Sequence, residues 1–272
     1  MTIELGCHKW SFARANTLAA AQIIRALGFE RMDIGNAPDL DPTEAAIHVA
    51  ETVATLNDIR ARTGVRYVDV FPQLPQLPND PDPEVRRISR QRLGAWFDIA
   101  EQAGLEGVTL TPGRYFAGHS AEEDFRRAAE ELRWAVGEGQ KRGLKTRIEP
   151  HVSSVTWTPF LAVQMVQEVP GLSLTIDHSH FVFHDTPFEH IALMHPYGTH
   201  WHARQARPGD ICCATNVGKI DFRRIVRDLR AQDYQGTICL EFTPGLWMAQ
   251  GYVDCVSETL ALAAQLREHL AE

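Results

Sequence analysis

The sequence predicts an α/β protein in which residues 1–272 form a single (β/α)8 barrel. Eight short apolar segments have the residue types of buried strands, and the stretches between them are long enough for crossover helices. No break in composition marks a linker. A doubly wound open sheet is the alternative, but the residues after the first strand, His8-Lys9-Trp10-Ser11-Phe12, contain no glycine-rich nucleotide-binding motif.

The predicted strands and helices alternate along the whole chain. The strands are expected at residues 3–8, 31–34, 66–71, 107–111, 144–149, 172–177, 198–202 and 236–241. The helices are expected at residues 17–27, 42–63, 84–103, 121–142, 159–169, 187–194, 222–232 and 253–270. Capping residues support three of the helix starts: Asp41 precedes Pro42, Ser120 stands three residues before Glu123, and Thr158 precedes a proline.

The longest irregular segment, residues 71–83, is rich in proline and follows the third predicted strand. Loops after the strands of a (β/α)8 barrel lie on its catalytic face. We therefore expect this segment to overhang the rim of the barrel, as a lid or as an oligomer contact.

Composition and charge limit the kinds of molecule that the protein is expected to bind. The net charge of −8 and the pI near 5.8 argue against nonspecific binding to nucleic acid. No run approaches the ~18 apolar residues of a membrane span, and the first residues lack the features of a secretion signal, so a soluble cytoplasmic protein is expected. The five cysteines show no paired zinc-finger spacing and suit a reducing compartment: Cys7, Cys212, Cys213, Cys239 and Cys255.

Four predicted strands in the second half each end on a side chain that can bind a metal: Glu149, Asp177, His202 and Glu241. Because the carboxyl ends of parallel strands meet at one rim, we expect these four side chains to converge. A single carboxylate at a strand end is commonly a helix cap or half of a surface ion pair. Four such residues at strand ends predict a divalent-metal site.

The motifs around these strand ends resemble the xylose isomerase-like superfamily of sugar isomerases and epimerases. The resemblance rests on Ile148-Glu149-Pro150, Asp177-His178-Ser179-His180, His202 followed by Gly218-Lys219-Ile220-Asp221-Phe222, and Cys239-Leu240-Glu241-Phe242. In the ketose 3-epimerase branch a metal is held by Glu, Asp, His and Glu in this order, which implies Glu149, Asp177, His202 and Glu241 here. The family often has an acidic residue three positions after this histidine, and Gln205 departs from that pattern.

Three carboxylates and one imidazole suit Mn²⁺ in particular, and Mg²⁺, Co²⁺ or Zn²⁺ as alternatives. A metal bridged by a substrate carbonyl and a neighbouring hydroxyl lowers the pKa of the C–H between them and stabilises the enediolate. Glu149 and Glu241 come from the fifth and eighth strands and are expected on opposite sides of the metal. One of them could remove the proton while the other returns it to the opposite face.

Several further side chains near the predicted rim are candidates for binding the substrate. They are His180, which the resemblance also implies, together with His8, Trp10, Arg204, Arg207 and Trp247. Each has an ordinary structural explanation as well. Core packing explains a tryptophan about equally well, and a solvated ion pair explains an arginine nearly as well. His8 could be merely solvated at the rim, and His180 could be a satisfied polar residue at a loop start, although a functional role is favoured for it. His200 shares the strand face of His202 and is expected as a packed residue one layer deeper, whereas Trp201 should pack against the helices.

The leading functional hypothesis is a metal-dependent isomerase or epimerase that acts on a ketose or keto-polyol. A lyase or dehydratase of the same superfamily is the alternative, because an enolate with a β leaving group eliminates. A phosphodiesterase similar to endonuclease IV needs further histidines, and the third and fourth strands end in Phe71-Pro72 and Thr111-Pro112 instead. A non-catalytic sugar-binding protein is the remaining hypothesis that does not involve an enzyme. The expected partner is a small carbohydrate, with homo-oligomer formation left open.

Overall fold

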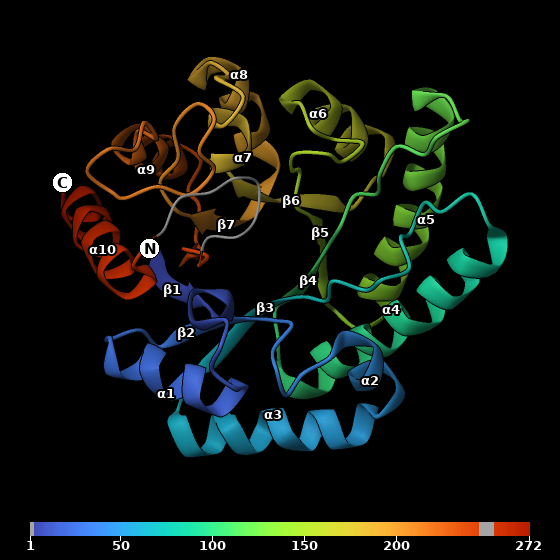
Figure 1. Cartoon of the computed structure of the whole chain (residues 1–272), viewed down its shortest axis with the longest axis horizontal. Helices are drawn as coiled ribbons and strands as arrows, with labels where there is room; N and C mark the ends of the chain where they lie inside the picture. The colour runs from blue at the N-terminus through green and yellow to red at the C-terminus, as the bar shows by residue number, and fades with distance from the viewer. Residues whose placement is uncertain (1–2, 245–252) are drawn as a thin grey trace.

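Eight parallel strands close into a barrel in the order β1-β2-β3-β4-β5-β6-β7-β8, as expected from the sequence (Figure 1). The computed structural model describes residues 3–244 and 253–272. The barrel closes where β1 pairs with β8, through registers such as Leu5 with Ile238. The strands are β1 (Glu4–His8), β2 (Arg31–Gly35), β3 (Arg66–Phe71), β4 (Gly107–Leu110), β5 (Lys145–Ile148), β6 (Leu172–Asp177), β7 (Gly198–Ala203) and β8 (Thr237–Leu240).

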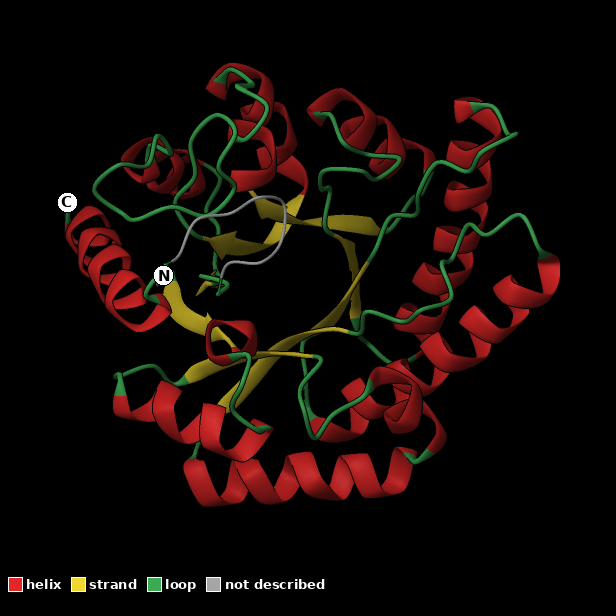
Figure 2. Ribbon diagram, viewed as in Figure 1, coloured by secondary structure: helices red, strands yellow, loops and turns green. Residues whose placement is uncertain are grey.

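Helices surround the ring of strands on its outside (Figure 2). The α-helices are α1 (Thr17–Ala26), α2 (Pro42–Ile47), α3 (Val49–Thr63), α4 (Pro83–Ala103), α5 (Ala121–Lys141), α6 (Pro159–Glu168), α7 (Ser179–Val182), α8 (Phe188–Ile191), α9 (Phe222–Ala231) and α10 (Cys255–Ala271). Two 3-10 helices, η1 (Lys9–Phe12) and η2 (Ala192–Tyr197), complete the set among the described residues. None of the helices formed by residues 3–244 and 253–272 is long and apolar enough to cross a membrane.

The predicted caps begin their helices in the expected way. The Asp41 side chain accepts hydrogen bonds from the backbone N–H groups of Thr43 and Glu44 at the start of α2. Ser120 and Glu123 form a reciprocal capping box at the start of α5, with both hydrogen bonds present. These bonds satisfy N–H groups that the first turn of a helix leaves without partners.

The structure corrects several predicted boundaries. The helix predicted at 42–63 is two helices, because His48 has φ −110° and ψ 55° and so interrupts the helical backbone between α2 and α3. The helix predicted at 187–194 is the short α8 followed by η2, which contains Pro196. The four-residue helices η1 and α7 were not predicted, since such short segments carry no periodic signal.

The interior of the barrel holds a buried polar layer that ties distant strands together. Arg147 of β5 forms an ion pair with Asp69 of β3, and its Nε donates to Thr199 Oγ1 of β7 at 2.9 Å. Thr109 of β4 and Thr175 of β6 share a hydrogen bond of 2.5 Å. Arg147 is 1% exposed, so its charge depends on these partners instead of on water.

We expect Arg147→Met to destabilise the fold by about 3–5 kcal/mol, because the substitution leaves the buried Asp69 carboxylate without its cation. Urea unfolding monitored by far-UV circular dichroism measures this loss. The double variant Arg147→Met/Asp69→Asn should recover much of it, because no charge then remains at the position of the pair. A single variant as stable as the original protein would show that the pair contributes nothing to folding.

Candidate metal centre and active-site cavity

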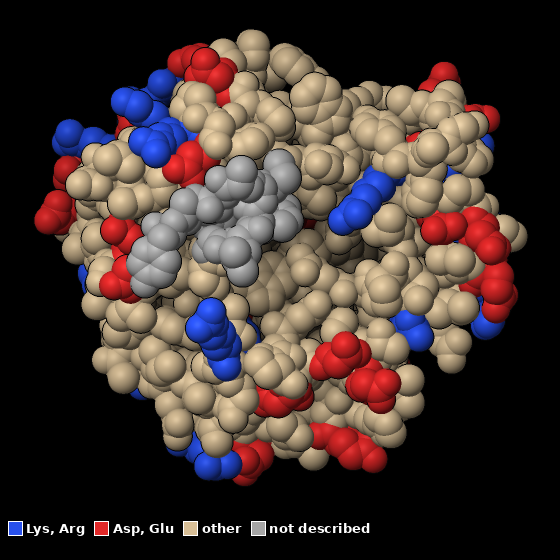
Figure 3. All heavy atoms as spheres, viewed as in Figure 1, with Lys and Arg blue, Asp and Glu red and all other residues tan. Residues whose placement is uncertain are grey.

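A cavity of about 440 Å³ lies at the carboxyl ends of the barrel strands. The space-filling view shows a hollow near the centre of this face (Figure 3). Six of its lining residues lie within three positions of a strand end: Trp10, Thr111, Glu149, His180, Arg204 and Glu241 come after β1, β4, β5, β6, β7 and β8. The proline-rich segment 71–83 contributes Phe71, Gln73, Leu74 and Leu77, so it forms part of the cavity wall at the rim, where it was predicted.

Three carboxylates and a histidine converge at the floor of this cavity. Glu149 and Glu241 each follow their strand by one residue, while Asp177 and His202 lie within β6 and β7. His202 Nδ1 lies 2.6 Å from Glu149 Oε1 and 3.4 Å from Glu241 Oε2. All four side chains are buried, the most accessible being Glu149 at 5%. The four predicted strand-end residues therefore meet in one place.

His180 lies beside this acidic cluster. Its Nε2 is 3.9 Å from Glu149 Oε2 and 3.9 Å from Asp177 Oδ2. Asp177 Oδ1 accepts a hydrogen bond from the Ser179 backbone N–H at 2.8 Å, which fixes the Asp177 carboxylate at the start of α7. The short helix α7 thus turns His180 back over the cluster.

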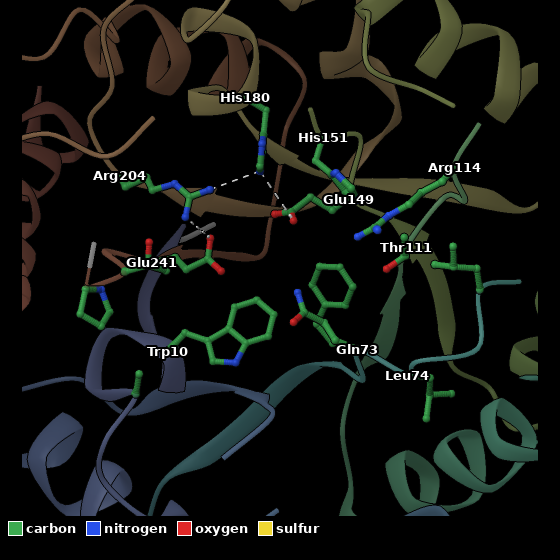
Figure 4. A pocket seen from close by; sticks show the side chains of 15 residues that line it. Trp10, Gln73, Leu74, Thr111, Arg114, Glu149, His151, His180, Arg204 and Glu241 are labelled. Atoms are coloured by element: carbon green, nitrogen blue, oxygen red, sulfur yellow. Dashed lines mark hydrogen bonds and ion pairs between the residues drawn. The ribbon is translucent and has the colours of Figure 1, made fainter. Parts of the chain in front are cut away.

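Arg204 supplies a cation to the same cluster. Its Nη2 lies 2.8 Å from Asp177 Oδ2. Its Nη1 lies 3.4 Å from Glu241 Oε2, a contact drawn in Figure 4. Its Nε donates to Ser179 Oγ at 2.9 Å, and the residue is 3% exposed. A buried guanidinium with fixed partners on one edge is well placed to offset the repulsion among carboxylates.

The pKa values of the cluster depend on burial and on these close charges. Burial raises the pKa of Glu241 to about 7, against the opposing effect of His202 and Arg204. Burial also acts to raise the pKa of Glu149, but His202 outweighs it and holds that pKa well below its usual value. For His202, burial acts to lower the pKa, yet Glu241 and Glu149 hold it well above the ordinary value. Without a metal, His202 and Arg204 are therefore the cations that balance the acids.

The donor set fits a divalent cation. The ligand atoms of Glu149, His202 and Glu241 all lie within 4.8 Å of one another, and so do those of Glu149, Asp177 and His180. Glu149 belongs to both groups. Glu241 Oε2 is buried and accepts no hydrogen bond from the described residues. Carboxylate oxygens with one imidazole nitrogen are ligands that Mn²⁺, Mg²⁺, Co²⁺ and Zn²⁺ all accept.

A further carboxylate, Asp33 of β2, orients the histidines from below. Asp33 Oδ2 lies 2.6 Å from His200 Nε2 and 3.4 Å from His202 Nε2, while Asp33 Oδ1 accepts the Asp69 backbone N–H at 3.2 Å. The contact with His202 Nε2 leaves Nδ1 directed at Glu149 and Glu241. This is the arrangement in which a carboxylate fixes the ring of a metal-binding histidine. His200 is 1% exposed, as expected for a packed residue one layer deeper.

Trp10 forms an aromatic wall of the cavity. Its backbone N–H donates to His8 Nδ1 at 3.0 Å, and its Nε1 donates to the Asn36 carbonyl at 3.2 Å. Its ring packs over Gly35, where an added Cβ would come within 2.4 Å of the indole. The close approach therefore requires glycine at residue 35.

The structure brings only some of the predicted substrate-binding residues to the cavity. Trp10, His180 and Arg204 line it. His8 does not line it, because it is fully buried and caps η1, so a direct substrate contact is not supported. Arg207 also lies outside the lining and pairs with Asp210 at 3.3 Å, since the chain has left β7 and turned outward. Trp247 lies outside the described residues.

Several residues of the site were not singled out from the sequence, among them Asp33, Gln73, Thr111 and Arg114. Asp33 carried a usable signal, since a carboxylate inside an otherwise apolar strand is costly to bury unless it is paired. Gln73, Thr111 and Arg114 lie on loops after β3 and β4, where the sequence shows no periodic pattern. Only the three-dimensional structure shows that these three side chains face the cavity.

Comparisons with known proteins agree with the fold. Residues 18–253 match the family model described as a xylose isomerase-like TIM barrel. No curated protein sequence matches the chain. One similar solved structure is the 3-keto-D-glucoside 4-epimerase YcjR from E. coli, which is 16% identical in sequence and has a TM-score of 0.77. The alignment covers 98% of this chain and 100% of YcjR. A second is a D-psicose 3-epimerase from Clostridium cellulolyticum H10, solved with D-tagatose, which is 16% identical and has a TM-score of 0.78. The alignment covers 98% of this chain and 99% of the epimerase chain.

We expect Arg204→Met to have opposite effects on the metal-free protein and on metal binding. The metal-free protein should lose about 3–5 kcal/mol of stability, because Asp177 and Glu241 lose a buried cation. Affinity for Mn²⁺ should rise about tenfold or more, because Asp177 Oδ2 is released and a repelling charge is removed. Thermal unfolding in EDTA and titration calorimetry with Mn²⁺ measure the two effects. Arg207→Met, which removes a surface pair, is the matched control, and weaker Mn²⁺ binding by Arg204→Met would contradict the expectation.

Asp33→Asn should weaken Mn²⁺ binding about 10- to 100-fold, because the His202 ring loses the carboxylate that orients it. Calorimetric titration of the folded variant provides the measurement. Asp39→Asn is a control outside the cluster, since Asp39 bonds only to Thr17 among the described residues. Unchanged affinity in Asp33→Asn would mean that Asp33 serves the packing of His200 alone.

Proposed function

The chain belongs to the xylose isomerase-like TIM barrel family, and from this premise we propose that it is a divalent-metal-dependent sugar isomerase or epimerase. The proposed substrate is a ketose or keto-polyol. The observation that carries the proposal is the convergence of Glu149 and Glu241 on His202, at distances of 2.6 and 3.4 Å, beneath an open cavity. Two carboxylates from different strands beside one cavity are the groups that a two-base proton transfer needs.

In the proposed reaction Glu149 and Glu241 act as the acid/base pair. They follow β5 and β8, which are separated by β6 and β7 around the barrel, so they approach the cavity from different sides. One carboxylate removes the proton next to the substrate carbonyl, and the other returns a proton to the opposite face. A carboxylate oxygen not engaged by other partners can carry the proton in each step.

Glu149, Asp177, His202 and Glu241 would hold the metal, with Mn²⁺ as the preferred ion and Mg²⁺, Co²⁺ or Zn²⁺ as alternatives. When bound, the ion supplies a positive charge that makes the C–H beside the substrate carbonyl more acidic. Asp33 keeps the His202 ring oriented, and Arg204 offsets the remaining negative charge. His180 lines the cavity next to Glu149 and is placed to hydrogen-bond a substrate hydroxyl.

The remaining walls suit a sugar ring or chain. Trp10 and Phe71 lie with ring centroids 5.5 Å apart and present an apolar surface opposite the polar floor. Aromatic faces stack on the C–H faces of carbohydrates, whereas the polar side chains fix the hydroxyl groups. The cavity thus offers one apolar wall and one polar floor to the same ligand.

Hydrogen exchange in heavy water tests this proposal. Protein loaded with Mn²⁺ should exchange a substrate C–H in at least one member of a panel of ketoses, keto-inositols and keto-glycosides. Glu149→Gln and Glu241→Gln should each lower the exchange rate about 10²- to 10⁴-fold, the usual contribution of a general acid or base. Glu268→Gln on the surface of α10 is the control.

The mass of the product separates the outcomes. A product that differs in mass from the substrate only by the incorporated deuterium identifies an isomerase or epimerase, and loss of water or of an aglycone identifies the lyase of the same superfamily. Exchange that persists in both carboxylate variants would refute the assigned roles of Glu149 and Glu241. Tight sugar binding without exchange at any carbon would instead favour a binding protein.

A further inference from the structure

Two arginines line the cavity among the described residues, and their situations differ. Arg204 is buried and committed to Asp177, Glu241 and Ser179. Arg114, in the loop between β4 and α5, is exposed, and its guanidinium forms no hydrogen bond or ion pair with a described residue. Figure 4 shows the Arg114 side chain extending from this loop toward the centre of the cavity, near His151 and Thr111.

The backbone that carries Arg114 is held rigidly by buried polar groups. Its N–H donates to Asn79 Oδ1 at 3.0 Å, and its carbonyl accepts from Asn79 Nδ2 at 2.7 Å. Asn79 is fully buried. Gly113 packs against the same amide, and a Cβ added there would come within 2.6 Å of Asn79. Its φ of +102° also lies in the region that favours glycine.

A second set of contacts fixes the remainder of this loop and Asn79 itself. The Phe116 N–H donates to Asp124 Oδ2 at 2.7 Å, and the Arg127 Nε donates to the Asn79 carbonyl at 2.9 Å. Asp124 and Arg127 pair with each other on α5. The scaffold holds the Arg114 Cα in one place while leaving its charged end available to a ligand.

The carboxylates of the site have other cationic partners than Arg114. Asp177 and Glu241 contact Arg204, and Glu149 contacts His202. Asp33 contacts His200 and His202. Arg114 therefore places a positive charge on the cavity wall without a carboxylate partner among the described residues. Thr111 and Gln73 line the same cavity and add hydrogen-bond donors to it.

We propose that the substrate of this site carries an anionic group, a carboxylate or a phosphate, that Arg114 binds. This inference rests on the proposed function, because it places the anion in the cavity whose floor holds Glu149 and Glu241. Guanidinium binds both anions in bidentate geometry. In the view of Figure 4, Arg114 lies on the side of Glu149 away from Glu241, so the anion and the reacting carbons occupy different parts of the cavity.

Affinities for three ketoses that share one carbon chain test the proposal: D-fructose, D-fructuronate and D-fructose 6-phosphate. Titration calorimetry on Mn²⁺-loaded protein should show at least tenfold tighter binding of one of the two anions than of D-fructose. Arg114→Gln should reduce this preference to less than threefold, and Arg114→Lys should retain part of it. Arg14→Gln removes another exposed arginine that does not line the cavity, and it should keep the full preference. Thermal unfolding verifies that each variant is folded.

Each outcome decides the proposal. The anion whose affinity falls in Arg114→Gln identifies the group as carboxylate or phosphate. If neither anion binds more tightly than D-fructose, or if the preference survives in Arg114→Gln, the proposal is overturned. Hydrogen exchange by the unaltered protein is a separate readout: Arg114-dependent anion binding without exchange refutes the proposed function alone, and exchange on neutral sugars without anion preference refutes the anion alone.

Discussion

The organisation of this molecule depends on the burial of several carboxylates within a few ångströms of one another. Such a group is unstable in a low-dielectric interior unless positive charges lie close by. Arg204 contacts Asp177 and Glu241, and His202 contacts Glu149 and Glu241, so two side chains of β7 and its following loop balance three acids from three other strands. The acids repel one another less when a cation is shared, and this allows the strand ends to converge.

The same requirement extends downward through the barrel. Asp33 is shared by His200 and His202, and the Asp69 backbone N–H binds its second oxygen. Below the histidines, Arg147 pairs with Asp69 and bonds to Thr199. Each charged side chain in this column has its partner on another strand, so the hydrogen bonds that orient the site also brace the sheet against distortion.

The sequence was most informative where periodicity and parallel topology act together. An apolar strand followed by a carboxylate predicts a side chain at one rim, and Glu149 and Glu241 lie there, one residue beyond their strands. It was least informative where a contact is formed between segments that are distant in the chain. His8 was expected at the substrate, but its ring caps a short helix that the sequence pattern does not predict. Arg207 lies in a turn after β7, and the local sequence does not predict which way that turn leads the chain. The position of Arg114 at the cavity depends on its backbone hydrogen bond to Asn79, which lies 35 residues away in the chain.

The proline-rich segment between β3 and α4 has a consequence for how such proteins diverge. Leu74 and Leu77 of this segment form part of the apolar wall, while Asn79 of the same segment clamps the loop that carries Arg114. The side chains at the floor come from other strands, and the segment supplies none of them. Insertions, deletions or exchanges within this one stretch can therefore alter cavity shape and the position of a charge in a single evolutionary step, while the reactive groups are inherited intact.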